Sequence, residues 1–71
     1  MNHYENLANA IILRAVADYR HALRKSKQHP ERDFFWQEIN SIERFFRSAW
    51  FCFLTGIDPE VLIRRLKTEV E

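Results

Sequence analysis

Apolar residues recur every three or four positions along three stretches of the chain, the spacing that places them on one side of an α-helix. The first stretch begins at Asn2, which with Glu5 three residues later forms a variant of the capping box that starts helices. The connection to the next helix is predicted at Ser26–His29, and Pro30 suits the first position of a helix. The predicted apolar face of this first helix is Ala8, Ile11, Ile12, Ala15, Tyr19, Ala22 and Leu23.

The second helix is predicted from Pro30 or Asp33 to Leu54 and is rich in aromatic residues. Both flanks of its apolar stripe are also apolar, with Trp36 and Trp50 on the same side. A stripe this broad needs more than one neighbour, so the helix is expected at the centre, packed by the other two helices or by a second copy of itself. The predicted stripe is Phe35, Ile39, Ile42, Phe46, Ala49 and Phe53.

Phe51 falls among the polar residues on the back of this predicted helix, almost opposite the apolar stripe. Two interpretations are open. Gly56 after Thr55 is typical of a Schellman ending with a left-handed glycine, in which the residue after the glycine packs against the last helical turn, so that Phe51 would cover Ile57. Alternatively, Phe51 is an exposed aromatic residue that contacts a partner.

The third helix has clear start signals. Asp58 is a good N-cap, Pro59 fits the first helical position, and Glu60 favours the positive end of the helix dipole. The predicted buried face is Leu62, Ile63, Leu66 and Val70. One Gly and two Pro among 71 residues leave few turns, which argues against a β-sheet protein. The sequence therefore predicts an all-α, compact three-helix domain that spans residues 1–71 as a single unit.

The charges nearly balance: eleven Lys and Arg face ten Asp and Glu, for a formal net charge of +1. A chain with so small a net charge has no strong long-range electrostatic attraction to nucleic acid or to an anionic membrane. A single Cys excludes an internal disulfide. The chain has no run of 18 apolar residues, and Met1–Glu5 lacks the order of a signal peptide, so a cytoplasmic protein without membrane contact is expected.

Candidate chemistry is sparse. His3, His21, His29 and Cys52 share no metal-ligand spacing, so no metal site is expected. Glu38 and Glu43 flank the apolar stripe and could be partly buried acids or bases, but Arg47 lies one turn after Glu43, the usual order for a helix ion pair. The sequence also has no glycine-rich phosphate loop. It therefore favours a protein that is not an enzyme and uses no cofactor.

Two binding functions remain. Basic helix faces allow DNA binding, although nearby acidic residues dilute every basic patch. These basic residues are Arg20, Arg24, Lys25, Lys27 and Arg32 around the first connection, Arg44 and Arg47 on the second helix, and Arg64, Arg65 and Lys67 on the third. The surplus of large aromatic residues on the second helix favours protein–protein binding instead, because Trp, Tyr and Arg dominate interface hot spots. The residues predicted to contact a partner are Arg44, Arg47, Trp50 and Phe51, with Arg20, Arg24 and Lys25 as a secondary charged patch.

One block of the chain is familiar as a pattern: Glu43–Phe51, followed by Leu54–Glu60 and preceded by Ala15–Arg20 and Ala22–Arg24. Together these segments resemble small, mostly uncharacterised helical proteins carried by phages, prophages and other mobile elements of Gram-positive bacteria. The resemblance implies an accessory protein that acts in a bacterial host by binding a host or phage protein. Inhibition of a host defence system, in the manner of anti-CRISPR proteins, is one form. A DNA-binding accessory or regulatory protein is the alternative.

Overall fold

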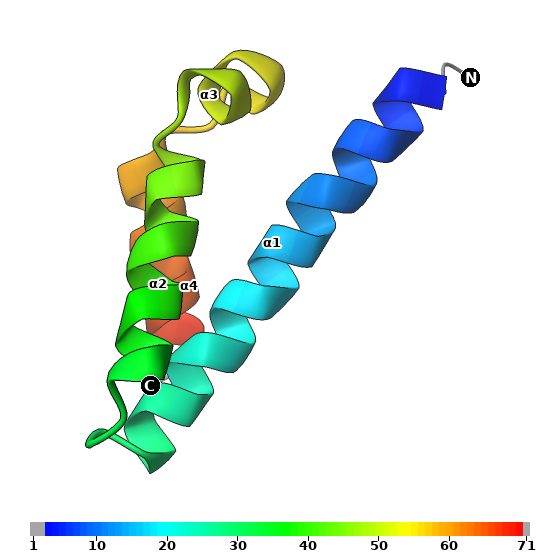
Figure 1. Ribbon diagram of the computed structural model, residues 1–71. Coiled ribbons are helices and arrows are strands. Elements are labelled where there is room, and N and C mark those ends of the chain that lie inside the picture. Colours follow the sequence, from blue (N-terminus) through cyan, green and yellow to red (C-terminus); the bar gives the residue numbers. More distant parts are fainter. Residues whose placement is uncertain (1–2, 71) are drawn as a thin grey trace.

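A computed structural model describes residues 3–70 of the chain, with side chains from Leu7 onward. Four α-helices make up this part: α1 (His3–Gln28), α2 (Asp33–Phe46), α3 (Ala49–Thr55) and α4 (Pro59–Val70), and these residues include no strand. Helices α1, α2 and α4 pack against one another, while the short α3 lies at the end of the molecule where α1 begins (Figure 1). The all-α prediction is confirmed, but the number of helices is four rather than three.

The predicted long second helix is wrong in its second half, because the chain breaks after Phe46. Ser48 adopts an extended backbone, with φ −69° and ψ 152°, and so cannot continue α2. Its hydroxyl oxygen instead accepts a hydrogen bond from the Phe51 N–H at 3.2 Å, which makes Ser48 the N-cap of a new helix. Helix α3 therefore leaves the direction of α2 and crosses the end of the bundle (Figure 1).

This break decides which aromatic residues are buried. Phe51 is 0% exposed, and its ring lies against Phe46 with 5.3 Å between ring centroids. Phe53, predicted for the apolar stripe, is 88% exposed, and Ala49 is exposed too. The predicted stripe is therefore right up to Phe46 and wrong beyond it. The interpretation of Phe51 as an exposed contact residue is also wrong.

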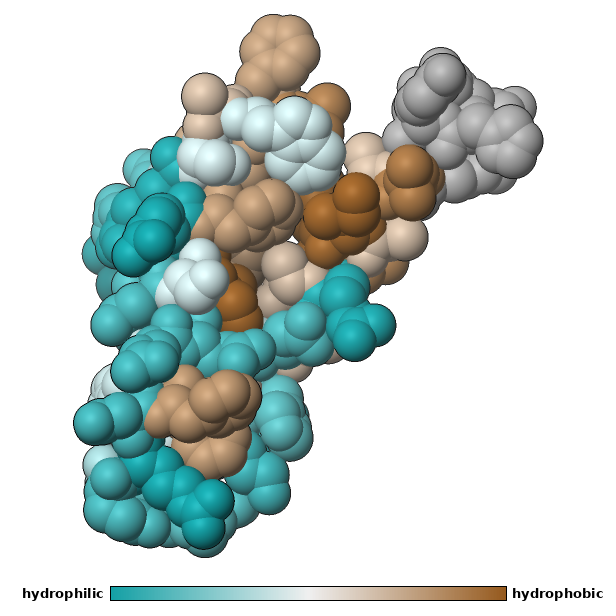
Figure 2. Space-filling view, in the orientation of Figure 1, coloured by the Kyte–Doolittle hydropathy of each residue, from teal (hydrophilic) through white to brown (hydrophobic). Residues whose placement is uncertain are grey.

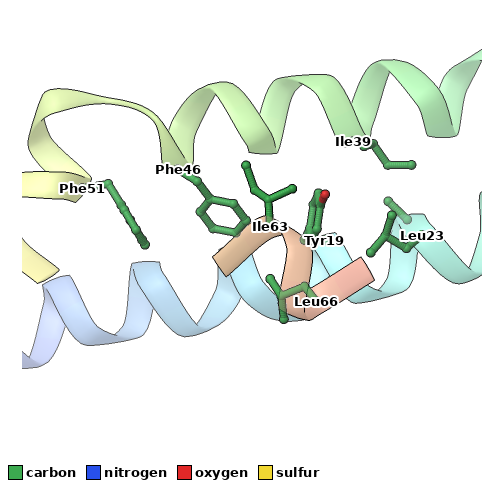
Figure 3. Close-up of a cluster of buried hydrophobic side chains, with 8 residues drawn as sticks. Tyr19, Leu23, Ile39, Phe46, Phe51, Ile63 and Leu66 are labelled. Carbon is green, nitrogen blue, oxygen red and sulfur yellow. The ribbon is translucent and has the colours of Figure 1, made fainter. Parts of the chain in front are cut away.

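The core forms where α1, α2 and α4 meet, and α3 closes one end of it with Phe51 (Figure 3). The Tyr19 and Phe46 rings pack edge to face at 5.4 Å, a favourable arrangement for aromatic pairs. The predicted buried face of α4 is confirmed, because Ile63 and Leu66 are buried while Leu62 and Val70 pack against the core. The buried apolar residues are Tyr19, Ala22, Leu23, Ile39, Phe46, Phe51, Ile63 and Leu66.

Helix ends follow the predicted signals in part. Asp58 caps α4, since its Oδ1 accepts from the Glu60 N–H at 2.9 Å. Gly56 is left-handed as predicted, with φ 65°, and its N–H donates to the Cys52 carbonyl at 2.9 Å. The Ile57 N–H, however, donates to the Thr55 hydroxyl at 3.1 Å, so α3 ends in the simpler left-handed motif rather than a Schellman motif.

The first connection lies later than predicted. Helix α1 continues through Ser26, which is buried and donates its hydroxyl to the Leu23 carbonyl at 2.8 Å. The loop occupies residues 29–32, and Pro30 lies within it rather than opening α2. The predicted capping box of Asn2 and Glu5 lies outside the side chains that the structure describes.

Candidate interaction surfaces

The structure separates the four residues predicted to contact a partner. Phe51 is in the core, and Trp50, 43% exposed, faces a groove between α3 and α1. Arg47 pairs with residues of α2 and α4, away from that groove. Arg44 is exposed on α2 and makes no ion pair with another described residue. The four side chains therefore do not form one patch.

Arg47 is held in a fixed position by two carboxylates. Its Nε and Nη2 donate to Glu60 Oε1 at 2.6 Å and Oε2 at 3.2 Å, a bidentate pair. Its Nη1 donates to Glu43 Oε1 at 3.4 Å, which confirms the predicted ion pair between Glu43 and Arg47. The hydrogen bond from Arg47 lowers the pKa of the Glu60 carboxyl, and the same bond raises the pKa of Arg47. Arg47 thus joins the end of α2 to the start of α4.

Glu43, considered as a catalytic acid or base, is occupied by structural partners. It is 8% exposed, and its Oε2 accepts a hydrogen bond from the Tyr19 hydroxyl at 2.7 Å. Lys67 Nζ lies 3.6 Å from the same oxygen. Burial, followed by the hydrogen bond to Glu43, raises the pKa of Tyr19. The cluster joins α1, α2 and α4 around one carboxylate.

A row of exposed polar and aromatic side chains runs along the outer side of α2. These residues are spaced by about one turn, and we call them the α2 face: Trp36, Asn40, Arg44 and Arg47. The Trp36 indole N–H donates to the Pro30 carbonyl at 3.4 Å, which orients the ring while 47% of the residue stays exposed. Trp36 was not among the predicted contact residues. Its spacing of eight from Arg44 was the signal that could have placed it there.

A second surface is almost wholly apolar and lies over α3 and the first half of α1. Figure 2 shows hydrophobic side chains gathered at this end of the molecule. A groove of about 250 Å³ runs between the two helices, lined by Leu7, Ala8, Ile11, Trp50 and Leu54. We call the exposed large side chains here the apolar end: Leu7, Ile11, Trp50, Phe53, Leu54 and Ile57.

The apolar end has two further properties. Segments 6–13 and 48–57, which contain its residues, hold no charged residue. In addition, no side chain of α1 from Leu7 to Asp18 is buried, and the first buried one is Tyr19. The first half of α1 is therefore packed on the side of Ile12, Ala15 and Val16, and it leaves Leu7, Ile11 and Leu13 exposed.

The predicted basic patch is partly neutralised. Arg20 Nε donates to Glu69 Oε2 at 2.9 Å, an ion pair that joins α1 to α4. Arg24 is exposed and Lys25 is half-buried. Of the three predicted cations, Arg20 therefore already has an acidic partner within the protein.

Two further hollows lie between α1 and α2, one of about 240 Å³ beside Ala15 and Ile42 and a smaller one nearer the first loop. Asp18, His21 and Glu38 line a pocket of about 150 Å³ together with Ala22, Phe34 and Phe35. Among the described side chains, no three His, Cys, Asp or Glu are grouped so that they could hold a metal ion. Cys52 is half-buried, and its Sγ lies 3.7 Å from the Phe46 carbonyl oxygen.

Comparison with known proteins adds no relative: no family model, curated protein or solved structure matches the chain. Within residues 3–70, no helix has both the length and the apolar character needed to cross a membrane. Function is therefore inferred from the exposed surfaces described above.

Proposed function

We propose that the protein acts by binding another protein, as a small accessory protein of a phage or mobile element. The observation that supports this function is the α2 face, on which Trp36 stays 47% exposed in line with the exposed Arg44 and Arg47. Exposed Trp and Arg side chains that lie close together are typical of interface hot spots.

The α2 face has the composition of a surface that binds a separate partner. Interfaces between proteins that also exist apart are about as polar as the rest of the surface, with Trp and Arg enriched at hot spots. Trp36 and Arg47 are already oriented by Pro30 and Glu60, so little side-chain freedom is lost on binding. Arg44 offers a cation to an acidic group. The partner is therefore a protein with an acidic group beside an apolar pocket.

Inhibition of a bacterial defence system, in the manner of anti-CRISPR proteins, is the concrete form of this proposal. It rests on the resemblance of Glu43–Phe51 and the neighbouring segments to proteins of phages and mobile elements. In this structure that block covers the end of α2, the break at Ser48 and the start of α3. Arg44 and Arg47 of the α2 face lie within it.

Affinity capture from host lysate, with and without nuclease, tests the proposal. We expect one stoichiometric protein that survives nuclease treatment. The purified partner should then bind the variant Trp36→Ala/Arg44→Ala at least 30-fold more weakly, because truncation of even one hot-spot residue costs about 2 kcal/mol or more. Arg64→Ala is the matched control, since Arg64 is an exposed arginine on α4. Equal binding of both variants, with unchanged helix content, would contradict the assignment of the α2 face.

A further inference from the structure

We infer that the apolar end is covered by a second copy of this chain, so that the protein is a homodimer joined through α3 and the first half of α1. This goes beyond the proposed function, whose partner contacts the α2 face. The α3 part of this interface falls within the predicted second helix, whereas α2 itself presents its apolar side to α1 and α4. Three independent properties of the surface support a second copy as the occupant.

The first property is the incomplete cover of the first half of α1. Ile12, Ala15 and Val16 pack against the core from one side, but no described side chain before Tyr19 is fully buried. Leu7 and Ile11 line the groove but remain 60% and 42% exposed. A surface that covers this groove supplies the missing packing.

The second property is the absence of charge. Across a two-fold axis the same patch meets itself, so a charged side chain near the centre would face its own copy. Segments 6–13 and 48–57 contain no charged residue and avoid this repulsion. Interfaces of permanent homodimers are also more apolar than those of transient complexes, with charges depleted at the core. A partner selected by charge complementarity would find nothing to pair with here.

The third property is the area of the patch. Phe53 is 88% exposed, and the six side chains of the apolar end expose 42–88% of their surface. With about 150–250 Å² for each of the two aromatic side chains and somewhat less for each of the four aliphatic ones, their exposed parts come to on the order of 500 Å². This area is close to the apolar share, about 65%, of the roughly 800 Å² that each partner buries in a stable complex.

Sedimentation equilibrium of the full chain at several concentrations tests this inference. We expect a mass of twice the 8.6 kDa chain at micromolar concentration. Phe53→Glu should raise the dimer dissociation constant at least 100-fold, because it places a charge within the apolar interface, and 88% exposure means that the core is untouched. The matched control is Phe34→Glu, a residue 64% exposed at the opposite end of α2, which should leave the dimer intact.

A second measurement uses Trp50 as a reporter of the apolar end. In a Trp36→Phe background Trp50 is the only tryptophan, and its emission should shift to longer wavelength as the dimer is diluted. A single-chain mass at all concentrations would overturn the inference, as would a dimer that Phe53→Glu and Phe34→Glu weaken equally. Such a result would leave the test of the α2 face unaffected.

Discussion

At the scale of single residues, the hydrogen bond between Tyr19 and Glu43 is the main polar contact of the core. A buried carboxylate is costly unless it is paired, and here Tyr19, Arg47 and Lys67 surround it. No buried side-chain nitrogen or oxygen among the described residues lacks a hydrogen-bond partner. The cluster therefore fixes the register of α1, α2 and α4 relative to one another.

Tyr19→Phe should lower the free energy of unfolding by about 1–3 kcal/mol at neutral pH, because it leaves one oxygen of Glu43 buried without its donor. The folded protein raises the pKa of Tyr19 above its ordinary value of 10.0. The contribution of the hydroxyl is therefore fully present below pH 10 and is lost as the pH rises above it. Urea denaturation at neutral pH and at about pH 11 checks this. If the difference in free energy of unfolding between wild type and variant is no smaller at the higher pH, this prediction is wrong.

At the scale of elements, the break between α2 and α3 determines which side chains are buried in the core and which are exposed at the apolar end. Ser48 adopts its extended conformation and caps α3, which turns Phe51 inward and Phe53 outward. A continuous helix would keep the α2 direction and place these two residues differently. One polar residue thus selects which phenylalanine is buried.

Ser48→Ala should destabilise the protein by about 0.5–2 kcal/mol, because it removes the acceptor of the Phe51 N–H. Ser48→Asp is the matched control and should retain most of the stability, since aspartate is an equally good N-cap. Thermal unfolding followed by circular dichroism measures both. Equal loss in the two variants would show that the cap hydrogen bond is not the cause.

Helix positions in this chain could be predicted from apolar spacing and from start signals such as Asp58, which the structure confirms as a cap. The break at Ser48 could not, because serine is tolerated inside helices and the apolar pattern continues across it. The misplaced Phe51 was the available signal, since it fell opposite the apolar stripe. The contacts of the α2 face could be predicted even less well. The sequence shows that Arg47 follows Arg44 by one turn, but only the packing of α4 brings Glu60 next to Arg47.

At the scale of the whole molecule, charge determines whether DNA binding is a realistic alternative. The net charge is +1, and the Arg20–Glu69 pair occupies part of the basic patch. We therefore expect no measurable affinity for duplex DNA at physiological salt in a filter-binding assay. Binding at that salt, with affinity falling steeply as salt rises, would establish DNA as a ligand, because each phosphate contact releases counterions. Arg24→Ala would then be expected to reduce the salt dependence.

The elongated shape also affects how many target-binding surfaces a dimer can use at once. The molecule measures 43 Å along its longest axis, and the loop that precedes α2 lies at the opposite end from α3 (Figure 1). A dimer joined at the apolar ends therefore carries two α2 faces, each with Trp36 at the end far from the joint. Against a target that repeats, such as a filament or a symmetric complex, the second contact forms within the same assembly, and avidity can exceed single-site affinity by about 10²–10⁴. A chain of 71 residues can in this way hold a large target through a contact that is weak on its own.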